Sequence, residues 1–355
     1  MLEELTTLAQ SRVEPPTTVW LLEEIASLYA KTGDKDGVET AVTRLSSELA
    51  NMRSQKRKYA SYQMQYEIHA LLHIARNWRT AESDSVVTHY VRRAEALAAS
   101  DPHPQTKPWS LMEVAQYDLQ QHDAERARKK LQQALDAAEL VSADPLSVAH
   151  EKGTLREVFA VWALDAQMYE VARTTIKDAI TALDDVGVPG VSSTFLPGIA
   201  VLQARSGDRS GVQTSLEELA KVRRLLVQAR AEHERDEAEY TYRMKRVVDL
   251  GNVADAYAHA GYYEDGVRYL NLAVEALGNA DARRDDWAGA VWNAIGKPAS
   301  ALGVMDVALK AEGKVRDSAF REEIYPVLFE ALLKKNNLKK ALDVAGATGN
   351  LLVIS

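Results

Sequence analysis

The amino-acid sequence predicts an all-α protein, an α-solenoid of about eight helix-turn-helix repeats with a period near 40 residues. Three observations predict this class. Apolar residues follow the three- and four-residue spacing of amphipathic helices, as in residues 245–260, and clean strand alternation is missing. Strong helix formers such as Ala, Leu, Glu, Arg and Gln are frequent. Short polar breaks recur at intervals that suit helical hairpins.

Two kinds of break are expected to divide the helices. Tight turns inside hairpins are predicted at residues 31–38, 75–84, 119–127, 164–172, 205–212, 259–267, 294–301 and 334–341. Longer loops that contain proline are predicted between hairpins, at residues 100–108, 142–147 and 186–198. The alternation of helix, tight turn, helix and looser loop accounts for the whole chain as one array of hairpins.

The domain organisation follows from the same breaks. Residues 1–355 are predicted to form a single helical-repeat array, with no second domain type. The turn pattern Gly-Asp-x-x-Gly-Val occurs at residues 33–38 and again at 207–212, an offset of 174 residues (207 − 33). Because this offset is close to half the chain, it suggests an internal duplication of residues 1–177 and 178–355.

Composition and charge narrow the class of protein. The formal net charge of −8 argues against a nucleic-acid binder, so the basic segments 52–59 and 125–130 are interpreted as solvated helix faces. The absence of Cys excludes disulfides, thiol catalysis and metal sites with Cys ligands. The acidic N-terminal segment does not resemble a signal peptide, and no apolar run is long enough to span a bilayer. A soluble, cytoplasmic protein is the prediction.

Several segments resemble the tetratricopeptide repeat family. The family pattern W-x2-L-G-x2-Y on a first helix, followed by A-x3-F on a second, is approximated by Leu250-x2-Val253-Ala254-x2-Tyr257 with Gly261 and Gly266-x3-Leu270. Further copies read Leu22-x2-Ile25-Ala26-x2-Tyr29 and Leu196-x2-Ile199-Ala200-x2-Gln203. The resemblance implies a right-handed solenoid whose first helices line a concave binding face. The chain departs from the family in its longer period and in lacking Trp in the first slot of these copies.

The resemblance gives each slot a physical role. Ala26, Ala200 and Ala254 are expected at close contacts between the two helices of a hairpin. The glycines at 33, 207 and 261 are expected to end first helices in a left-handed conformation. The aspartates at 34 and 208 suit the start of the following helices.

A stripe of tyrosines and histidines offers the most distinctive chemistry. Tyr59, Tyr62, Tyr66, His69 and His73 are spaced 3, 4, 3 and 4 residues apart and fall on one helical face. Packing against neighbouring helices is the favoured interpretation, because the residue at 70 is the small Ala of the repeat pattern. A His69/His73 metal pair is the alternative, but it lacks the Glu that a zinc protease places after its first His, and a third ligand would have to come from another helix.

The resemblance also places a partner-binding groove on the first helices, and no catalytic, cofactor-binding or metal-binding residue is predicted. The groove would contain Trp20, Glu23, Ser27, Tyr59, Tyr62, Met64, Glu67, Leu71, Val248, Asp255 and His259.

The predicted function is that of a non-enzymatic scaffold or adaptor that binds a protein or peptide on its concave face, without a nucleic-acid partner and without a membrane span. The acidic charge favours a partner segment of basic character. One alternative is an enzyme of the α/α-toroid type with a carboxylate-lined central pocket, which solution scattering would separate from an elongated solenoid. Another is a regulatory or sensor module of a larger protein. The apolar tail at residues 349–355 suggests packing on the last helix, a homo-oligomer contact through the C-terminus, or continuation into a further domain.

Overall fold

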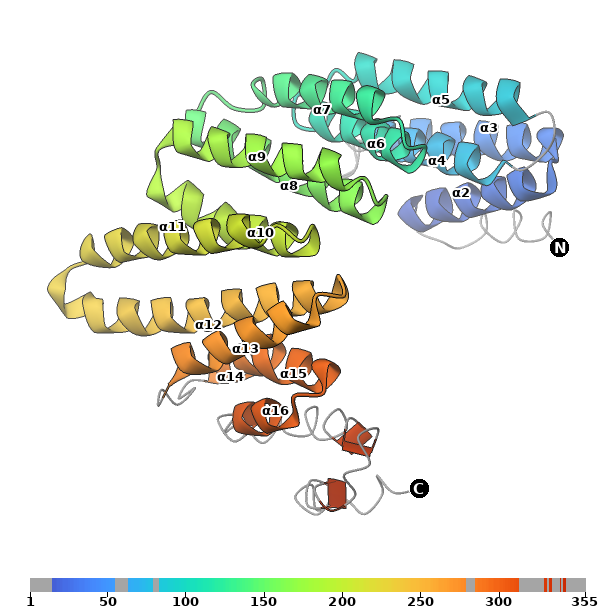
Figure 1. Cartoon of the computed structure of the whole chain (residues 1–355). Coiled ribbons are helices and arrows are strands. Elements are labelled where there is room, and N and C mark those ends of the chain that lie inside the picture. The colour runs from blue at the N-terminus through green and yellow to red at the C-terminus, as the bar shows by residue number, and fades with distance from the viewer. Residues whose placement is uncertain are drawn as a thin grey trace. The chain divides into compact units, whose positions relative to one another are not determined.

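The computed structural model describes residues 15–54, 63–78, 83–278 and 285–312, together with short stretches between residues 329 and 342. All regular elements in these ranges are helices, and successive helices are joined by short turns into pairs (Figure 1). The predicted all-α class and the hairpin architecture are therefore confirmed. The predicted handedness of the array remains a prediction.

The chain divides into two compact units, Met1–Thr175 and Ile176–Ser355. In its described residues, the first unit contains the helices α2 to α8 and the start of α9. In order these are α2 (Pro15–Thr32), α3 (Lys35–Ser54), α4 (Gln63–Asn77), α5 (Ser83–Ser100), α6 (Lys107–Gln120), α7 (Ala124–Ala138), α8 (Pro145–Asp165) and α9 (Tyr169–Val186). The first helices of its hairpins, α2, α4, α6 and α8, pack against one another in that order. They form a continuous layer on which side chains from different hairpins can meet.

The second unit continues the same pattern. After α9 it holds α10 (Pro189–Arg205), α11 (Arg209–Gln228), the short 3-10 turn η2 (Glu232–Glu234), α12 (Arg235–His259) and α13 (Tyr263–Leu277). A bent helical segment follows, made of α14 (Asp285–Val291), the π-helix η3 (Trp292–Gly296) and α15 (Lys297–Leu302), before α16 (Met305–Glu312). The core of this unit includes Tyr257 stacked on Tyr269, with ring centroids 5.5 Å apart.

The small residues of the repeat pattern are buried. Ala26, Ala200 and Ala254 are all 0% exposed. Because protein interiors are closely packed, a larger side chain at any of these positions would have to displace its neighbours. The slots inferred from the resemblance are confirmed as packing positions.

First helices end in a recurring left-handed residue. The predicted glycines Gly33, Gly207 and Gly261 have φ values of 76°, 75° and 85°. His122 and Gln167 take the same conformation at φ 57° and 58° although they carry side chains, which costs about 1–2 kcal/mol in each case. The aspartates that follow cap the second helices, because Asp34 Oδ1 and Asp208 Oδ1 each accept a hydrogen bond from a backbone N–H at 2.9 Å.

Two predicted breaks are wrong. Residues 189–198 of the predicted loop 186–198 belong to α10, because Pro189 takes the first helical position, where a missing N–H is tolerated, and Pro197 is accommodated inside the helix. The predicted turn at 294–301 is helical, since the wider π turn of η3 precedes Pro298 and carries the chain past a residue without an N–H. The turn lies instead at Gly303, with φ 71°.

The other predicted turns agree with the structure where residues are described. The predicted turn at 334–341 lies largely, and the C-terminal tail at 349–355 entirely, outside the described residues. No helix in the described part of the chain combines the length and apolar character needed to cross a bilayer.

Candidate partner-binding face on the first helices

Glu23 on α2 is the centre of a polar cluster in the first unit. Its side chain is only 8% exposed, and its Oε1 lies 3.3 Å from His69 Nε2 and 3.2 Å from His73 Nδ1, both on α4. The two imidazole rings lie nearly parallel, with centroids 6.3 Å apart. A carboxylate buried to this degree is costly unless opposite charge lies close to it. His69 supplies that charge when it is protonated, and His73 lies beside the carboxylate without a hydrogen bond to it.

His69 connects α2 and α4 to the next first helix. Its Nδ1 lies 3.1 Å from Glu113 Oε2 on α6, within hydrogen-bond distance. This hydrogen bond and the negative charges of Glu113 and Glu23 raise the pKa of His69, while burial and the charge of Arg76 oppose the rise. Nδ1 forms a hydrogen bond with Glu113, while Nε2 lies close to the Glu23 carboxylate, so a positive charge on the ring is favoured from both sides. The geometry therefore suits an imidazolium that bridges three helices.

The cluster continues along the same layer of helices. Arg76, one turn beyond His73, lies over the ring of Tyr117 on α6, with its guanidinium carbon 5.9 Å from the ring centroid. Burial lowers the pKa of Arg76. Trp109 Nε1, also on α6, donates a hydrogen bond of 2.8 Å to Glu151 on α8. Polar contacts thus join all four first helices of the unit.

Two aromatic side chains lie exposed beside this cluster. Trp20 is 55% exposed and Tyr66 is 36% exposed. Trp20 precedes Glu23 by three residues and Tyr66 precedes His69 by three, so each lies one helical turn from a member of the cluster and on the same face. The His69 side chain itself is 43% exposed. The face therefore offers aromatic surface next to charged groups that are held in place.

The other predicted groove residues divide between surface and interior. Ser27 and Leu71 are buried at 0% and 1% exposure and contribute to packing. Met64 is half-buried. Glu67 turns toward the second helices, where its Oε1 lies 2.7 Å from Arg93 Nη2 on α5 and receives a long hydrogen bond from Ser46 on α3.

The remaining predicted residues do not join the cluster. Asp255 and His259 lie on α12 in the second unit, where His259 Nδ1 is 3.3 Å from Asp255 Oδ2 on an exposed surface. Val248, also on α12, is half-buried. Tyr59 and Tyr62 lie outside the described residues.

The packing interpretation of the tyrosine and histidine stripe holds only in part. Ala70 is 1% exposed and packs as predicted, whereas Tyr66 is exposed and His69 is an electrostatic bridge. Within the described ranges, no three His, Cys, Asp or Glu side chains are grouped so that they could hold a metal ion. Glu113, Arg76, Trp109 and Glu151 were not predicted, because no sequence pattern indicates which turns of neighbouring helices come level with each other.

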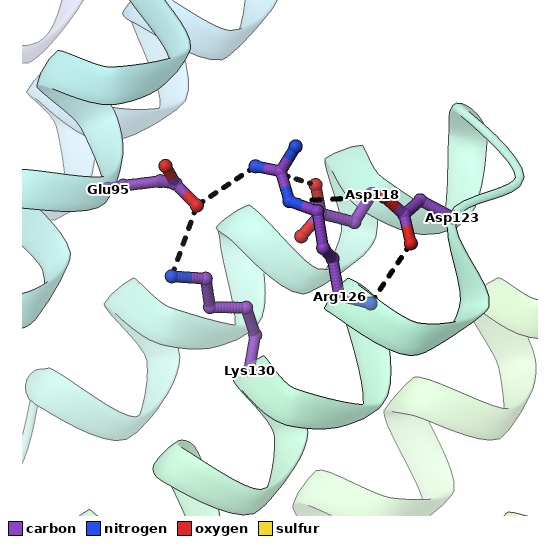
Figure 2. A network of polar contacts seen from close by, with 5 residues as sticks. All are labelled: Glu95, Asp118, Asp123, Arg126 and Lys130. Carbon is purple, nitrogen blue, oxygen red and sulfur yellow. Dashed lines mark hydrogen bonds and ion pairs between the residues drawn. The ribbon is translucent and has the colours of Figure 1, made fainter.

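A second network fastens the α4/α5 hairpin to the α6/α7 hairpin (Figure 2). Arg126 Nη2 on α7 lies 3.0 Å from Glu95 Oε1 on α5 and 3.5 Å from Asp118 Oδ1 on α6. Lys130 lies 3.2 Å from the same Glu95 oxygen, and Asp123 accepts a hydrogen bond from the Arg126 backbone N–H. Burial raises the pKa of Asp118 to about 6, opposed by the charge of Arg126. Arg126 and Lys130 of the predicted basic segment therefore hold neighbouring hairpins together, whereas Arg128 and Lys129 between them are exposed.

The chain was compared with known proteins by sequence and by structure. No family model matches the sequence, and no curated protein matches it. Among solved structures, the chain is similar to a circular tandem repeat protein with novel repeat topology and enhanced subunit contact surfaces, at 15% identity and a TM-score of 0.39, with 98% of this chain and 89% of that one covered. It is also similar to Ton1535 from Thermococcus onnurineus NA1, at 14% identity and a TM-score of 0.37, with 99% and 92% covered. Neither likeness is close enough to support a functional assignment.

Proposed function

We propose that this chain is a non-enzymatic scaffold of tetratricopeptide type that binds a protein or peptide segment along the first helices of its first unit. One observation carries the proposal. The exposed rings of Trp20 and Tyr66 lie beside a polar cluster that spans α2, α4 and α6. Tyr and Trp are the residues most often found to dominate binding energy at protein interfaces.

The cluster favours binding because it is already ordered. Glu23 and Glu113 hold His69 from two sides, so little side-chain freedom remains to be lost when a partner arrives. A partner can gain contact area on the aromatic rings without first arranging the charged groups beneath them. This fits a surface that recognises an extended or helical segment through several modest contacts.

The charge of the cluster indicates the partner's chemistry. Three carboxylates, Glu23, Glu113 and Glu151, lie along this face together with the imidazoles of His69 and His73 and the guanidinium of Arg76. Above the pKa of His69 the imidazole becomes neutral, which leaves the carboxylate of Glu113, the more exposed of its two acidic neighbours, available to a cation. We therefore propose a segment that presents Lys or Arg next to an apolar side chain.

Site-specific photo-crosslinking tests the location. A photoreactive phenylalanine analogue would be placed at Trp20, at Tyr66 and, as a matched control, at Leu140, which is 72% exposed in the same unit but lies outside the cluster. Crosslinking in the source cells should capture one common partner from positions 20 and 66 and not from position 140. Equal capture from all three positions, or a partner captured only from position 140, would contradict the proposed face.

Affinity measurements with the captured partner test the energetics. Trp20→Ala should weaken binding by about 1–3 kcal/mol, the range for an aromatic anchor at an interface, and Leu140→Ala should leave it unchanged. Circular dichroism would establish that both variants keep their helices. A Trp20→Ala variant that binds like the wild type would remove the main support for this proposal.

A further inference from the structure

Two adjoining hollows open on the second unit around α11 and α12. The first has a volume of about 510 Å³ and is lined by residues of α11, η2 and α12, with Ser193 of α10. The second has a volume of about 480 Å³ and is lined by α11, α12 and α13. Arg223 and Tyr242 line both, so these two side chains form the wall between the hollows. Hollows of this size are within the usual range for binding sites.

Arg223, one of the two side chains between the hollows, forms a buried ion pair. Arg223 and Asp249 are only 8% and 7% exposed and pair directly with each other. Because the two charges neutralise one another in a protected position, Arg223 is held in place and contributes little net charge to a ligand. The charge available in the second hollow must therefore come from its rim.

The rim of the second hollow is cationic, in contrast to the acidic chain as a whole. Arg224, Arg246 and Arg268 are exposed, and none of the three forms an ion pair with a carboxylate among the described residues. Arg268 lies over the ring of Tyr269, its guanidinium carbon 5.8 Å from the ring centroid. The exposed acid of this rim, Glu217, instead accepts a hydrogen bond of 2.9 Å from Gln213.

The floor of the same hollow is apolar. It is formed by side chains from all three helices, namely Leu216, Leu219, Ala220, Leu250, Leu272 and the ring of Tyr269. An apolar floor inside a ring of arginines matches a ligand that carries an apolar group between negative charges. Arginine is suited to the second part of this task, because its planar fork binds a carboxylate through two parallel hydrogen bonds.

We propose that the second hollow is a docking site for an acidic peptide segment, with a Leu-like side chain on the floor and Glu or Asp carboxylates on Arg224, Arg246 and Arg268. This site goes beyond the proposed function, since it lies in the other unit and selects the opposite charge. A peptide is favoured over a nucleic acid because the sugar and phosphate groups of a nucleic acid would leave the apolar floor unused.

Fluorescence anisotropy with a defined probe tests the site. The probe is a fluorescein-labelled peptide in which leucines are separated by pairs of glutamates, and it is compared with a peptide that has serine at every leucine and one that has lysine at every glutamate. The intact chain should bind the first peptide, should bind the serine peptide about tenfold more weakly, and should not bind the lysine peptide. Equal binding of the leucine and serine peptides would overturn the role of the floor and with it the proposal.

Variants of the full chain locate the binding. Arg224→Glu combined with Arg246→Glu should weaken binding of the leucine peptide by at least about tenfold, and about 0.5 M salt should have a similar effect on the wild type. The matched control is Arg128→Glu with Lys129→Glu on α7, two exposed cations of the first unit, which should bind like the wild type. Circular dichroism checks that both double variants are folded, and Arg224→Gln with Arg246→Gln should give a smaller loss in the same direction.

Two further outcomes would refute this site. One is equal weakening by the two double variants, since general charge would then account for the binding. The other is a single-stranded oligonucleotide that binds more tightly than the leucine peptide and depends on the same arginines, because the ligand class would then be wrong. Trp20→Ala should leave peptide binding unchanged, so failure here is distinct from failure of the face on the first helices.

Discussion

Gly251 on α12 marks a place where two helices approach too closely for any side chain. A Cβ added there would lie 2.0 Å from the backbone oxygen of Ala294 in η3 and 2.5 Å from its carbonyl carbon. Gly251→Ala therefore forces backbone atoms apart, because no flexible side chain is available to move. The distance between α12 and η3 at this contact would have to increase by most of an atomic radius.

Two opposing effects set the size of the change. Replacing glycine by alanine inside a helix stabilises it by about 0.5–1 kcal/mol, mainly through the unfolded state. Overpacking a close contact costs about 1–3 kcal/mol, and contact with a fixed backbone falls at the upper end of that range. We expect the second effect to win, so that Gly251→Ala lowers the free energy of unfolding by about 2 kcal/mol.

Two other glycines provide matched controls. Nothing lies within 4 Å of a Cβ at Gly190, near the start of α10, so Gly190→Ala should be neutral or slightly stabilising. A Cβ at Gly266 would lie 3.1 Å from the backbone oxygen of Ala254, an intermediate contact for which the two effects should nearly cancel. The expected order of stability is Gly190→Ala, then Gly266→Ala, then Gly251→Ala.

Urea unfolding followed by far-UV circular dichroism would measure this order. Hydrogen exchange of α12 would separate the response of the second unit from that of the first, since an array of repeats need not unfold in one step. If Gly251→Ala proved as stable as Gly190→Ala, the close approach of α12 and η3 would be refuted.

Two further predictions concern pH. The pKa of His69 in the folded protein is raised above the usual 6.5. Its stabilising effect is therefore complete below pH 6.5 and is lost as the pH rises through the folded pKa. The urea midpoint of the wild type should fall between about pH 6 and about pH 8, and His69→Gln should make that fall smaller. Burial raises the pKa of Asp118 from 3.8 to about 6, so its ionisation opposes folding as the pH rises through this interval. Asp118→Asn should therefore be more stable than the wild type by about 1–3 kcal/mol at about pH 8, with the difference shrinking toward pH 4, as urea unfolding would measure. A wild-type midpoint that does not change with pH, or an Asp118→Asn variant less stable at about pH 8, would contradict these assignments.

The hairpin fold could be predicted because its determinants are local. A small residue such as Ala254 at the helix contact, a glycine such as Gly207 that can take positive φ, and the aspartate after it all act within one hairpin. Proline misled the prediction at two places, residues 186–198 and 294–301. In both, the helix tolerates a residue without an N–H, through a favourable first position at Pro189 and through a π turn ahead of Pro298.

The candidate face was predicted less well because it depends on contacts between hairpins. Trp20 and Glu23 were assigned to the binding surface, and Glu23 does form the centre of the cluster. Its contacts on α4 are His69 and His73, two residues that the repeat pattern places in packing slots. Which side chains of neighbouring helices meet is set by the packing of many side chains at once, and no local pattern in the sequence indicates it.

The left-handed turns have a consequence for how such chains diverge. Gly33, Gly207, Gly261 and Gly303 share positive φ with His122 and Gln167, so the same turn forms with and without glycine. A side chain in this conformation costs about 1–2 kcal/mol, and the packing of the hairpin has to offset that cost. An array built in this way can therefore lack a characteristic residue in some repeats and still keep its architecture. The regularity of such a chain is visible in its torsion angles even where it is missing from the letters of its sequence.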